Sequence, residues 1–221
     1  MSSSLVIAPH PDDELLGCGA SLLREVEEGK EIHWLIMTKM RPSEQFPEQT
    51  ISQRNLEIQN ISKTMGFSST RQLDFYAAEL DTYRMIDIID SIGEVIKTIN
   101  PATLYLPFKG DVHSDHLITF NAAKSCAKWF RFPSVKRIYC YETVSETDQG
   151  LSSIEHFVPN RYVDVTSFIE KKIEILKIYD SEFGLQPFPR SPEIIRSQAA
   201  LRGSQCGVEY AEAFSIMKEI V

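Results

Sequence analysis

Short apolar runs alternate with longer segments of helical periodicity along most of the chain. Runs of four to eight apolar residues bounded by turn residues are typical of buried strands. They predict strands over residues 4–8, 32–38, 71–75, 103–106 and 137–141. Helices are expected between them, over residues 15–28, 48–65, 83–99 and 115–129. This alternation favours right-handed βαβ units and a mostly parallel sheet with helices on both faces.

The order weakens beyond residue 142. There the pattern predicts a strand near 162–165, a helix over 167–179, an irregular segment with three prolines over 184–192, and a helix over 193–201. Tyr210 and Phe214 are expected on one helical face that packs this part of the chain. Because no flexible linker precedes residue 143, we expect one domain over 1–221, with a core of about 1–142 and an appended segment of about 143–221. The expected fold class is α/β, a Rossmann-like, mostly parallel sheet flanked by helices.

The charge balance narrows the range of partners. The chain has 23 Lys and Arg against 31 Asp and Glu, a net charge of −8, and its basic residues form no cluster. Nucleic acid and anionic membrane surfaces are therefore disfavoured. The stretch Met1–Ser4 has no basic residue and the apolar run 5–8 is too short for a signal peptide or membrane span, so a cytoplasmic location is the default. The four cysteines are widely spread, and we expect reduced, mostly buried thiols. Whether the chain forms a homo-oligomer stays open.

Three of the five histidines lie in two compact clusters that also hold carboxylates. The first cluster is His10-Pro11-Asp12-Asp13-Glu14, and the second is Asp111-Val112-His113-Ser114-Asp115-His116. They follow the first and the fourth expected strand. Open α/β sheets bind ligands beyond the carboxyl ends of strands, where the strand order reverses. With a strand order 3-2-1-4-5 the two clusters meet at that point.

Imidazoles and carboxylates without thiolates suit a divalent first-row metal, most often zinc. Two histidines and one carboxylate leave one position for water, which such a metal activates at neutral pH. In an extended turn the neighbouring carboxylates Asp12 and Asp13 would point apart, one toward the metal and the other toward the water. His113 would then face the developing oxyanion.

A structural alternative exists for each cluster. Residues 12–14 and Asp115 could act only as helix caps that complement the helix dipole. Two such clusters at matching strand ends favour a site instead. Gly17-Cys18-Gly19 lies inside an expected helix, where close packing on the sheet explains it better than dinucleotide binding. No nucleophile motif is present, so covalent catalysis is disfavoured.

These residues resemble the PIG-L/LmbE-like deacetylases, zinc-dependent enzymes that remove an acetyl group from N-acetylglucosamine-type amines. The resemblance rests on residues 8–14 with 16–20, on 111–116, on Arg54 and Glu57, and on 207–214. It implies that His10, Asp13 and His116 bind zinc. It also implies that Asp12 is the general base and that Arg54 contacts polar groups of the substrate. His113, oriented by Asp115, would stabilise the oxyanion or protonate the leaving amine.

The sequence departs from the family pattern at Ser181-Glu182, where many members have Ser-Gln, and at Lys39-Met40, where a glycine is common. Arg54 also has an alternative role as a solvated helix residue paired with Glu57. We expect a metal-dependent amidohydrolase that removes the N-acetyl group of a small-molecule amino sugar or sugar conjugate. Two alternatives stay open: the same centre acting on another amide, such as one in an antibiotic or nucleotide sugar, and a non-catalytic metal- or sugar-binding relative. Iron, cobalt or manganese could replace zinc.

Overall fold

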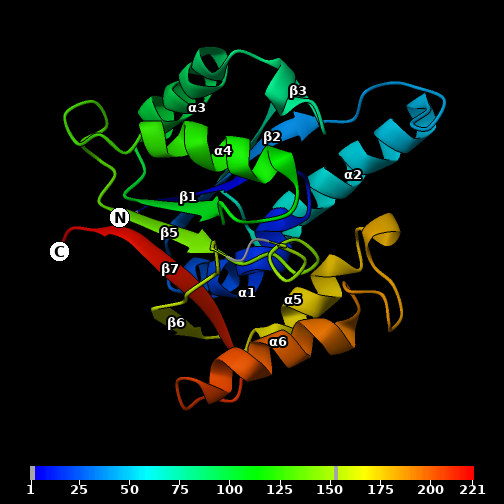
Figure 1. Cartoon of the computed structure of the whole chain (residues 1–221). Coiled ribbons are helices and arrows are strands. Elements are labelled where there is room, and N and C mark those ends of the chain that lie inside the picture. The colour runs from blue at the N-terminus through cyan, green and yellow to red at the C-terminus, as the bar shows by residue number, and fades with distance from the viewer. Residues whose placement is uncertain (1–2, 152–153) are drawn as a thin grey trace.

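The computed structural model describes residues 3–151 and 154–221 of the chain. Met1 and Ser2, part of the N-terminal stretch considered above, lie outside these residues. Within them, one seven-stranded sheet has the order β3-β2-β1-β4-β5-β7-β6 (Figure 1). The strands are β1 (Ser3–Ala8), β2 (Glu31–Lys39), β3 (Ser69–Tyr76), β4 (Thr103–Pro107), β5 (Arg137–Tyr141), β6 (Arg161–Asp164) and β7 (Ala211–Glu219). The expected order 3-2-1-4-5 is confirmed.

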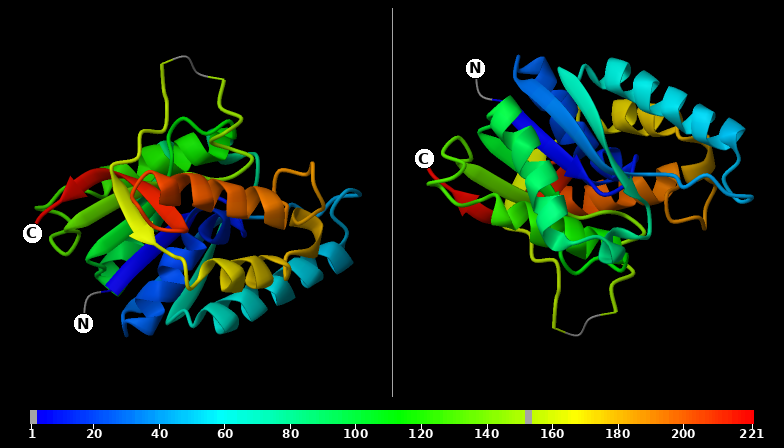
Figure 2. Two further views of the ribbon diagram at one scale, coloured as in Figure 1. Left: turned by 90° about the horizontal axis from the view of Figure 1, so that it is seen from below. Right: turned by 90° about the horizontal axis from the view of Figure 1, so that it is seen from above.

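Helices cover both faces of the sheet (Figures 1 and 2). The helices are α1 (Asp13–Glu27), α2 (Glu48–Met65), α3 (Met85–Ile99), α4 (Ser114–Ser125), α5 (Ile169–Leu176) and α6 (Pro192–Ser204), with single 3₁₀ turns at Leu80–Thr82 and Asp180–Glu182. α3 and α4 lie on one face, and α1, α2, α5 and α6 on the other (Figure 1). The predicted α/β class is confirmed.

Strand β1 is buried on both faces, which explains its continuous apolar sequence. Val6 and Ala8 pack with α1, α2, α5 and α6, whereas Leu5 and Ile7 pack with α3 and α4. Strands β1 and β4 are parallel neighbours. The carboxyl ends of these two central strands therefore lie side by side, where the parallel strands of the sheet end.

Helix α1 packs closely on the sheet at Gly17. A Cβ atom there would lie 2.1 Å from a ring carbon of Tyr141 in β5. No real side chain tolerates that distance, so close packing accounts for the glycine, as the sequence predicted. The helix is also kinked at Cys18, whose φ is −145°.

The appended segment joins the sheet, and here one prediction was wrong. Residues 211–219 form strand β7, which pairs antiparallel with both β5 and β6, rather than a helical face. Phe214 lies opposite Tyr141 on one side and Arg161 on the other. The first four residues of β7 are all buried, including the charged Glu212, so burial along this strand does not follow the polarity of the sequence.

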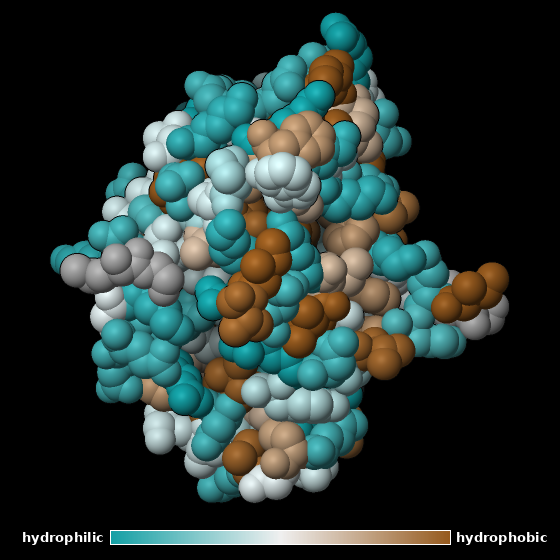
Figure 3. All heavy atoms as spheres, turned by 90° about the vertical axis from the view of Figure 1, so that its left-hand side faces the viewer, coloured by the Kyte–Doolittle hydropathy of each residue, from teal (hydrophilic) through white to brown (hydrophobic). Residues whose placement is uncertain are grey.

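The expected helix over 115–129 is also shorter than predicted. It ends at Ser125, and Trp129, which continued the apolar pattern, is 71% exposed. Trp129 and the neighbouring Phe130, which is 63% exposed, therefore have no buried surface to pack against in a longer helix. On the side of the molecule that holds the chain termini, hydrophobic side chains lie scattered among hydrophilic ones (Figure 3).

Cys18, Cys126 and Cys140 are buried thiols, Cys206 is exposed, and none of the four forms a disulfide, as expected. Among the described residues, no helix has both the length and the apolar character needed to cross a membrane.

Candidate metal centre and catalytic cavity

The two acidic histidine clusters meet at the carboxyl ends of β1 and β4. His10 comes from the turn after β1, Asp13 from the start of α1, and His116 from the first turn of α4. Their ligand atoms all lie within 4.8 Å of one another. Asp13 Oδ2 is 3.4 Å from His10 Nδ1 and 3.3 Å from His116 Nε2. The residues that the resemblance implied as metal ligands thus converge on one point.

A second carboxylate fixes each imidazole from behind. Asp115 Oδ2 is 3.0 Å from His10 Nε2, and Asp111 Oδ2 is 2.7 Å from His116 Nδ1. A histidine whose far nitrogen bonds a carboxylate is the usual arrangement around protein-bound metals. His116 is fully buried, and its Nε2 atom makes no hydrogen bond with the described residues. This unpaired nitrogen beside Asp13 fits a metal ligand, and the nitrogen and oxygen donors fit zinc or a similar divalent ion.

The local electrostatics favour positive charge at this point. Burial alone lowers the pKa of His10, but its hydrogen bonds to Asp115 and Asp13 outweigh burial and raise the pKa to about 9. Burial likewise opposes ionisation of Asp13, yet His116 and His10 hold the pKa of this carboxyl well below its usual range. The pocket between the three side chains is therefore suited to a cation.

Asp12 lies beside this centre in an uncommon backbone conformation. Its φ of 130° and ψ of −29° differ from the extended turn expected from the sequence, and Asp13 already begins α1. Such a φ costs a non-glycine residue about 1–3 kcal/mol and is found mostly at functional sites. The Asp12 side chain is 6% exposed, and its Oδ2 accepts a 2.6 Å hydrogen bond from Arg190 Nη1. Burial, and next the charge of Asp13, raise the pKa of Asp12 to about 7, although Arg190 opposes the shift.

The capping alternative does not describe these residues. No side chain caps the start of α1, even though Asp12 occupies the cap position. At the start of α4, the cap is His113, whose Nδ1 accepts a 3.1 Å hydrogen bond from the Asp115 main-chain N–H. The clusters are therefore more than helix caps.

His113 lines the cavity above the metal centre. Because its Nδ1 accepts a hydrogen bond, the neutral ring carries its proton on Nε2. Burial, and then the charge of His10, lower the pKa of His113 and favour this neutral form. The Asp115 carboxylate accepts from His10 and from the main-chain N–H groups of Ala78 and Leu80. The described contact of Asp115 with His113 is made by its main chain.

A cavity of about 530 Å³ opens beside these residues. This volume suits a small organic ligand. The long loop after β2 borders it with Met40, Ser43 and Phe46. Polar and charged side chains also line it: His10, Asp12, Arg54, His113, Glu146, Glu182 and Arg190.

Arg54 is a cavity residue rather than a solvated one, since it is 6% exposed. Its Nε lies 3.2 Å from Glu57, as the sequence alternative expected, but both side chains are buried. Its Nη2 donates to Ser181 Oγ at 2.9 Å and to Glu182 Oε1 at 2.6 Å. The Ser181-Glu182 departure from the family pattern therefore lies in the cavity wall.

The sequence did not identify Arg190, Glu146 or the role of Asp111. Arg190 binds Asp12 and also lies 3.9 Å from Glu146, whose carboxylate accepts from the His113 main-chain N–H. Arg190 is the one basic residue in the proline-containing segment 184–190, and this was the only indication that the sequence offered. Its partners depend on how that irregular segment folds.

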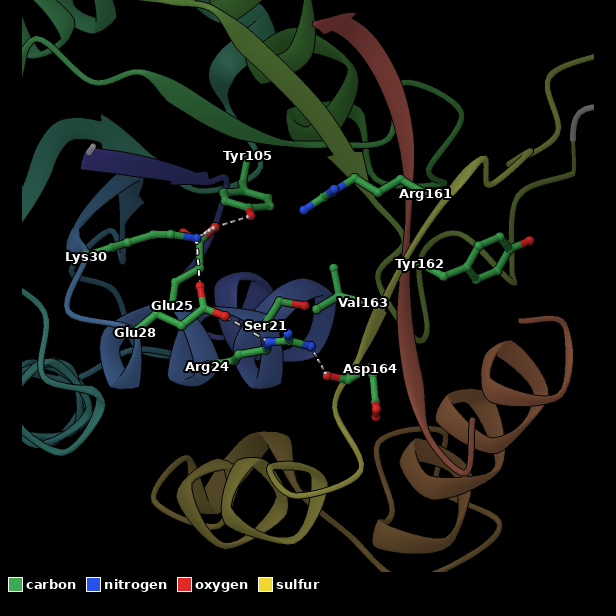
Figure 4. A pocket seen from close by; sticks show the side chains of 10 residues that line it. All are labelled: Ser21, Arg24, Glu25, Glu28, Lys30, Tyr105, Arg161, Tyr162, Val163 and Asp164. Carbon is green, nitrogen blue, oxygen red and sulfur yellow. Dashed lines mark hydrogen bonds and ion pairs between the residues drawn. The ribbon is translucent and has the colours of Figure 1, made fainter. Parts of the chain in front are cut away.

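A second cavity, of about 400 Å³, lies near the amino ends of the parallel strands (Figure 4). Its charged side chains largely pair with each other: Glu28 contacts Arg24 and Lys30, and Glu25 accepts from Lys30 and Tyr105 (Figure 4). No histidine lines it. It lacks the convergent imidazoles that define the first cavity.

The fold and this centre are those of a class of α/β hydrolytic enzymes, and the comparison with known families agrees. Residues 5–127 match the PIG-L family, described as GlcNAc-PI de-N-acetylase. The chain belongs to this family. The resemblance and the predicted enzyme class, an N-deacetylase, are confirmed.

Two curated relatives and one solved structure show how far the similarity extends. The chain is 29% identical to the uncharacterized deacetylase YaiS of Escherichia coli over 173 residues, 76% of this chain and 88% of that protein. It is 24% identical to the diacetylchitobiose deacetylase of Thermococcus kodakarensis over 229 residues, covering 98% of this chain and 83% of the relative. The conserved protein TT1542 of Thermus thermophilus has the same fold, with a TM-score of 0.81, 25% identity, and coverage of 100% of this chain and 97% of its own.

Proposed function

We propose that this deacetylase is a metal-dependent amidohydrolase that removes the N-acetyl group from a small N-acetylated amino sugar or sugar conjugate. The observation that carries this proposal is the convergence of His10, Asp13 and His116 beside the strained Asp12 at the edge of an open cavity. The name of the Thermococcus relative, a diacetylchitobiose deacetylase, supports a sugar substrate.

His10, Asp13 and His116 would hold the metal, for which we propose zinc, with iron, cobalt or manganese as alternatives. A metal with this ligand set supplies Lewis acidity, which makes water more acidic and polarises an amide carbonyl. Asp115 and Asp111 act as positioning residues, because they fix the rings of His10 and His116 through the nitrogens that face away from the centre. For Asp115 this assignment replaces the expected role of orienting His113.

Asp12 is the proposed general base. Its buried carboxylate lies next to Asp13 without an imidazole partner, so it is placed to take a proton from the attacking water. A positioned base of this kind contributes about 10²- to 10⁴-fold in rate. Arg190 holds one of its oxygens and leaves the other for the proton.

His113 is the proposed partner of the reacting carbonyl. With Nδ1 fixed by the Asp115 main chain, its Nε2–H is the donor that remains for a developing oxyanion or for the leaving amine. Arg54 lines the same cavity as His113, and we propose that it contacts polar groups of the sugar.

The proposal is tested by acetate release from a panel of amides. N-acetylglucosamine glycosides should release acetate with metal-loaded protein, and a chelator should abolish the release until metal is restored. Release from other acyl amides but from no acetylated sugar would favour the alternative substrate class. Binding of metal and sugar without any release would favour a non-catalytic relative.

Two further expectations remain proposals. A cytoplasmic location would be tested by cell fractionation, and the oligomeric state by light scattering of the purified protein.

A further inference from the structure

Glu182 has an unusual position in the cavity wall, between two arginines from different parts of the chain. Its Oε1 accepts a 2.6 Å hydrogen bond from Arg54 Nη2, and its Oε2 accepts a 2.8 Å hydrogen bond from Arg190 Nη1. Arg54 comes from α2 and Arg190 from the irregular segment that precedes α6. One carboxylate thus binds both guanidinium groups, one oxygen to each.

A pair of arginines facing one point in a cavity is the usual recognition site for a carboxylate or a phosphate. Here the point is already occupied by a side chain of the protein. Glu182 is also still accessible, since its side chain is 31% exposed and lines the cavity. An acidic group on a ligand would therefore have to compete with Glu182 for the same N–H donors.

The surrounding charges oppose such a group as well. Arg54 lies 3.2 Å from Glu57, and Arg190 lies 2.6 Å from Asp12 and 3.9 Å from Glu146. Together with Glu182, four carboxylates face two guanidinium groups along this wall. The arginines are neutralised in place, and the wall carries no surplus positive charge to attract an anion.

The wall is also close to the reacting atoms. Arg190 binds Glu182 and Asp12 through the same Nη1 atom. In N-acetylglucosamine, the anomeric carbon is bonded directly to the ring carbon that carries the amide. A substituent on the anomeric oxygen of a sugar held for attack beside Asp12 can therefore reach this wall.

We propose that Glu182 is a specificity-determining residue that makes this enzyme select uncharged over acidic amino sugar conjugates. The inference rests on the proposed function for its substrate class. Glu182 fills, with its own carboxylate, the place between Arg54 and Arg190 that an acidic aglycone would take. The enzyme therefore acts on neutral glycosides of N-acetylglucosamine, and it discriminates against glycosides with a carboxylate next to the scissile amide.

The test compares two substrates of similar size, the methyl and the carboxymethyl glycosides of N-acetylglucosamine, which differ by one carboxylate. Wild-type protein should cleave the methyl glycoside with a kcat/KM at least about tenfold higher. Glu182→Gln keeps the size of the side chain but leaves an oxygen for only one arginine. This variant should reduce the ratio of the two kcat/KM values by about tenfold, mainly through a lower KM for the carboxymethyl glycoside.

Two controls separate this role from a structural one. Glu182→Asp keeps the charge and should retain most of the discrimination. Glu170→Gln makes the same carboxylate-to-amide change in an exposed pair with Arg196 and should leave both substrates unaffected. The wild-type gap should also shrink as salt increases, because the effect is electrostatic.

Equilibrium binding of the two deacetylated glycosides gives a readout that needs no turnover. Wild-type protein should bind the methyl form more tightly, and Glu182→Gln should bring the two affinities together. If neither acetylated glycoside releases acetate, the proposed function fails while these affinities still test Glu182. If wild type and Glu182→Gln discriminate between the two glycosides to the same extent, both in affinity and in kcat/KM, the inference is overturned. The deacetylase activity is then unaffected by this result.

Discussion

Two of the regions that line the cavity differ in whether their residues form compact clusters in the sequence. The turns after β1 and β4 supply His10, Asp12, Asp13 and His116 from two short clusters. The appended segment supplies residues that are widely separated along the chain: Glu146, Glu182 and Arg190. The difference indicates that two recognisable clusters, brought together by the pairing of β1 with β4, encode the reactive centre, whereas single residues in irregular segments build the surrounding wall.

The two regions also differ in how their charges are arranged. At the strand ends, carboxylates fix imidazoles so that the free nitrogens face one point. In the cavity wall, Glu182 and Arg190 of the appended segment pair with each other and with Arg54 and Asp12 from the core, in contacts of 2.6–2.8 Å. The first arrangement suits binding of a cation, and the second suits selection among substrates.

His116→Ala should have the largest effect, because it removes a ligand from the strand-end region. We expect bound metal to fall from about one ion per chain to near zero, since a catalytic site of this type has only three protein ligands. Acetate release should fall to background. Elemental analysis of the purified protein measures the first quantity. His33→Ala, in β2 and outside the centre, is the control and should retain its metal. Full metal occupancy in His116→Ala would show that the proposed ligand set is incorrect.

Asp12→Ala should separate binding of the metal from turnover within the same region. The variant should keep its metal, because Asp12 is not among the converging ligand atoms. Its kcat should fall by about 10²- to 10⁴-fold, the usual contribution of a general base. Steady-state kinetics and metal analysis on the same sample test this. A kcat equal to that of wild type in Asp12→Ala would show that Asp12 is not the general base.

The comparison also explains which features the sequence could predict. Strand order and the meeting of the two clusters follow from βαβ connectivity, which places the ends of β1 and β4 side by side. The place of the centre in the fold therefore follows from the sequence. Strand β7 was missed because its buried run, residues 211–214, is short and contains the charged Glu212, so it lacks the continuous apolar sequence that predicted β1.

The wall could not be predicted in the same way. The helical spacing of Arg54 from Ile58 and Ile61 places it on the buried face of α2, but this spacing does not show that its guanidinium contacts Ser181 and Glu182. Arg190 ends a segment without regular structure, and its contacts with Asp12 and Glu182 arise from tertiary packing. Spacing along the chain carries no information about such contacts.

Glu212→Ala tests how firmly the appended region is attached to the core. Glu212, in β7, accepts hydrogen bonds from the main chain of Ala20 and Ser21 in α1 and from Lys172 Nζ. Removing it leaves the charge of Lys172 buried at 3% exposure. We expect a loss of about 3–5 kcal/mol in the free energy of unfolding, measured with urea.

Glu170→Ala is the matched control within the appended segment. Its ion pair with Arg196 is exposed, so its loss should change the free energy of unfolding by less than about 1 kcal/mol. Equal losses in the two variants would mean that the contacts of Glu212 do not anchor β7 to α1.

Asp111→Asn should have the smallest effect of the four, because it changes only a residue behind the centre. Asp111 holds His116 Nδ1 at 2.7 Å, and the amide can still accept that hydrogen bond but carries no charge. Metal affinity should fall by about 10- to 100-fold, the usual result of removing such a partner. Competition with a calibrated chelator measures it. With excess metal, kcat should recover to near the wild-type value, since the ligands and Asp12 are unchanged. A kcat that stays low at saturating metal would assign Asp111 a direct part in the reaction and extend the reactive centre beyond the residues that face the cavity.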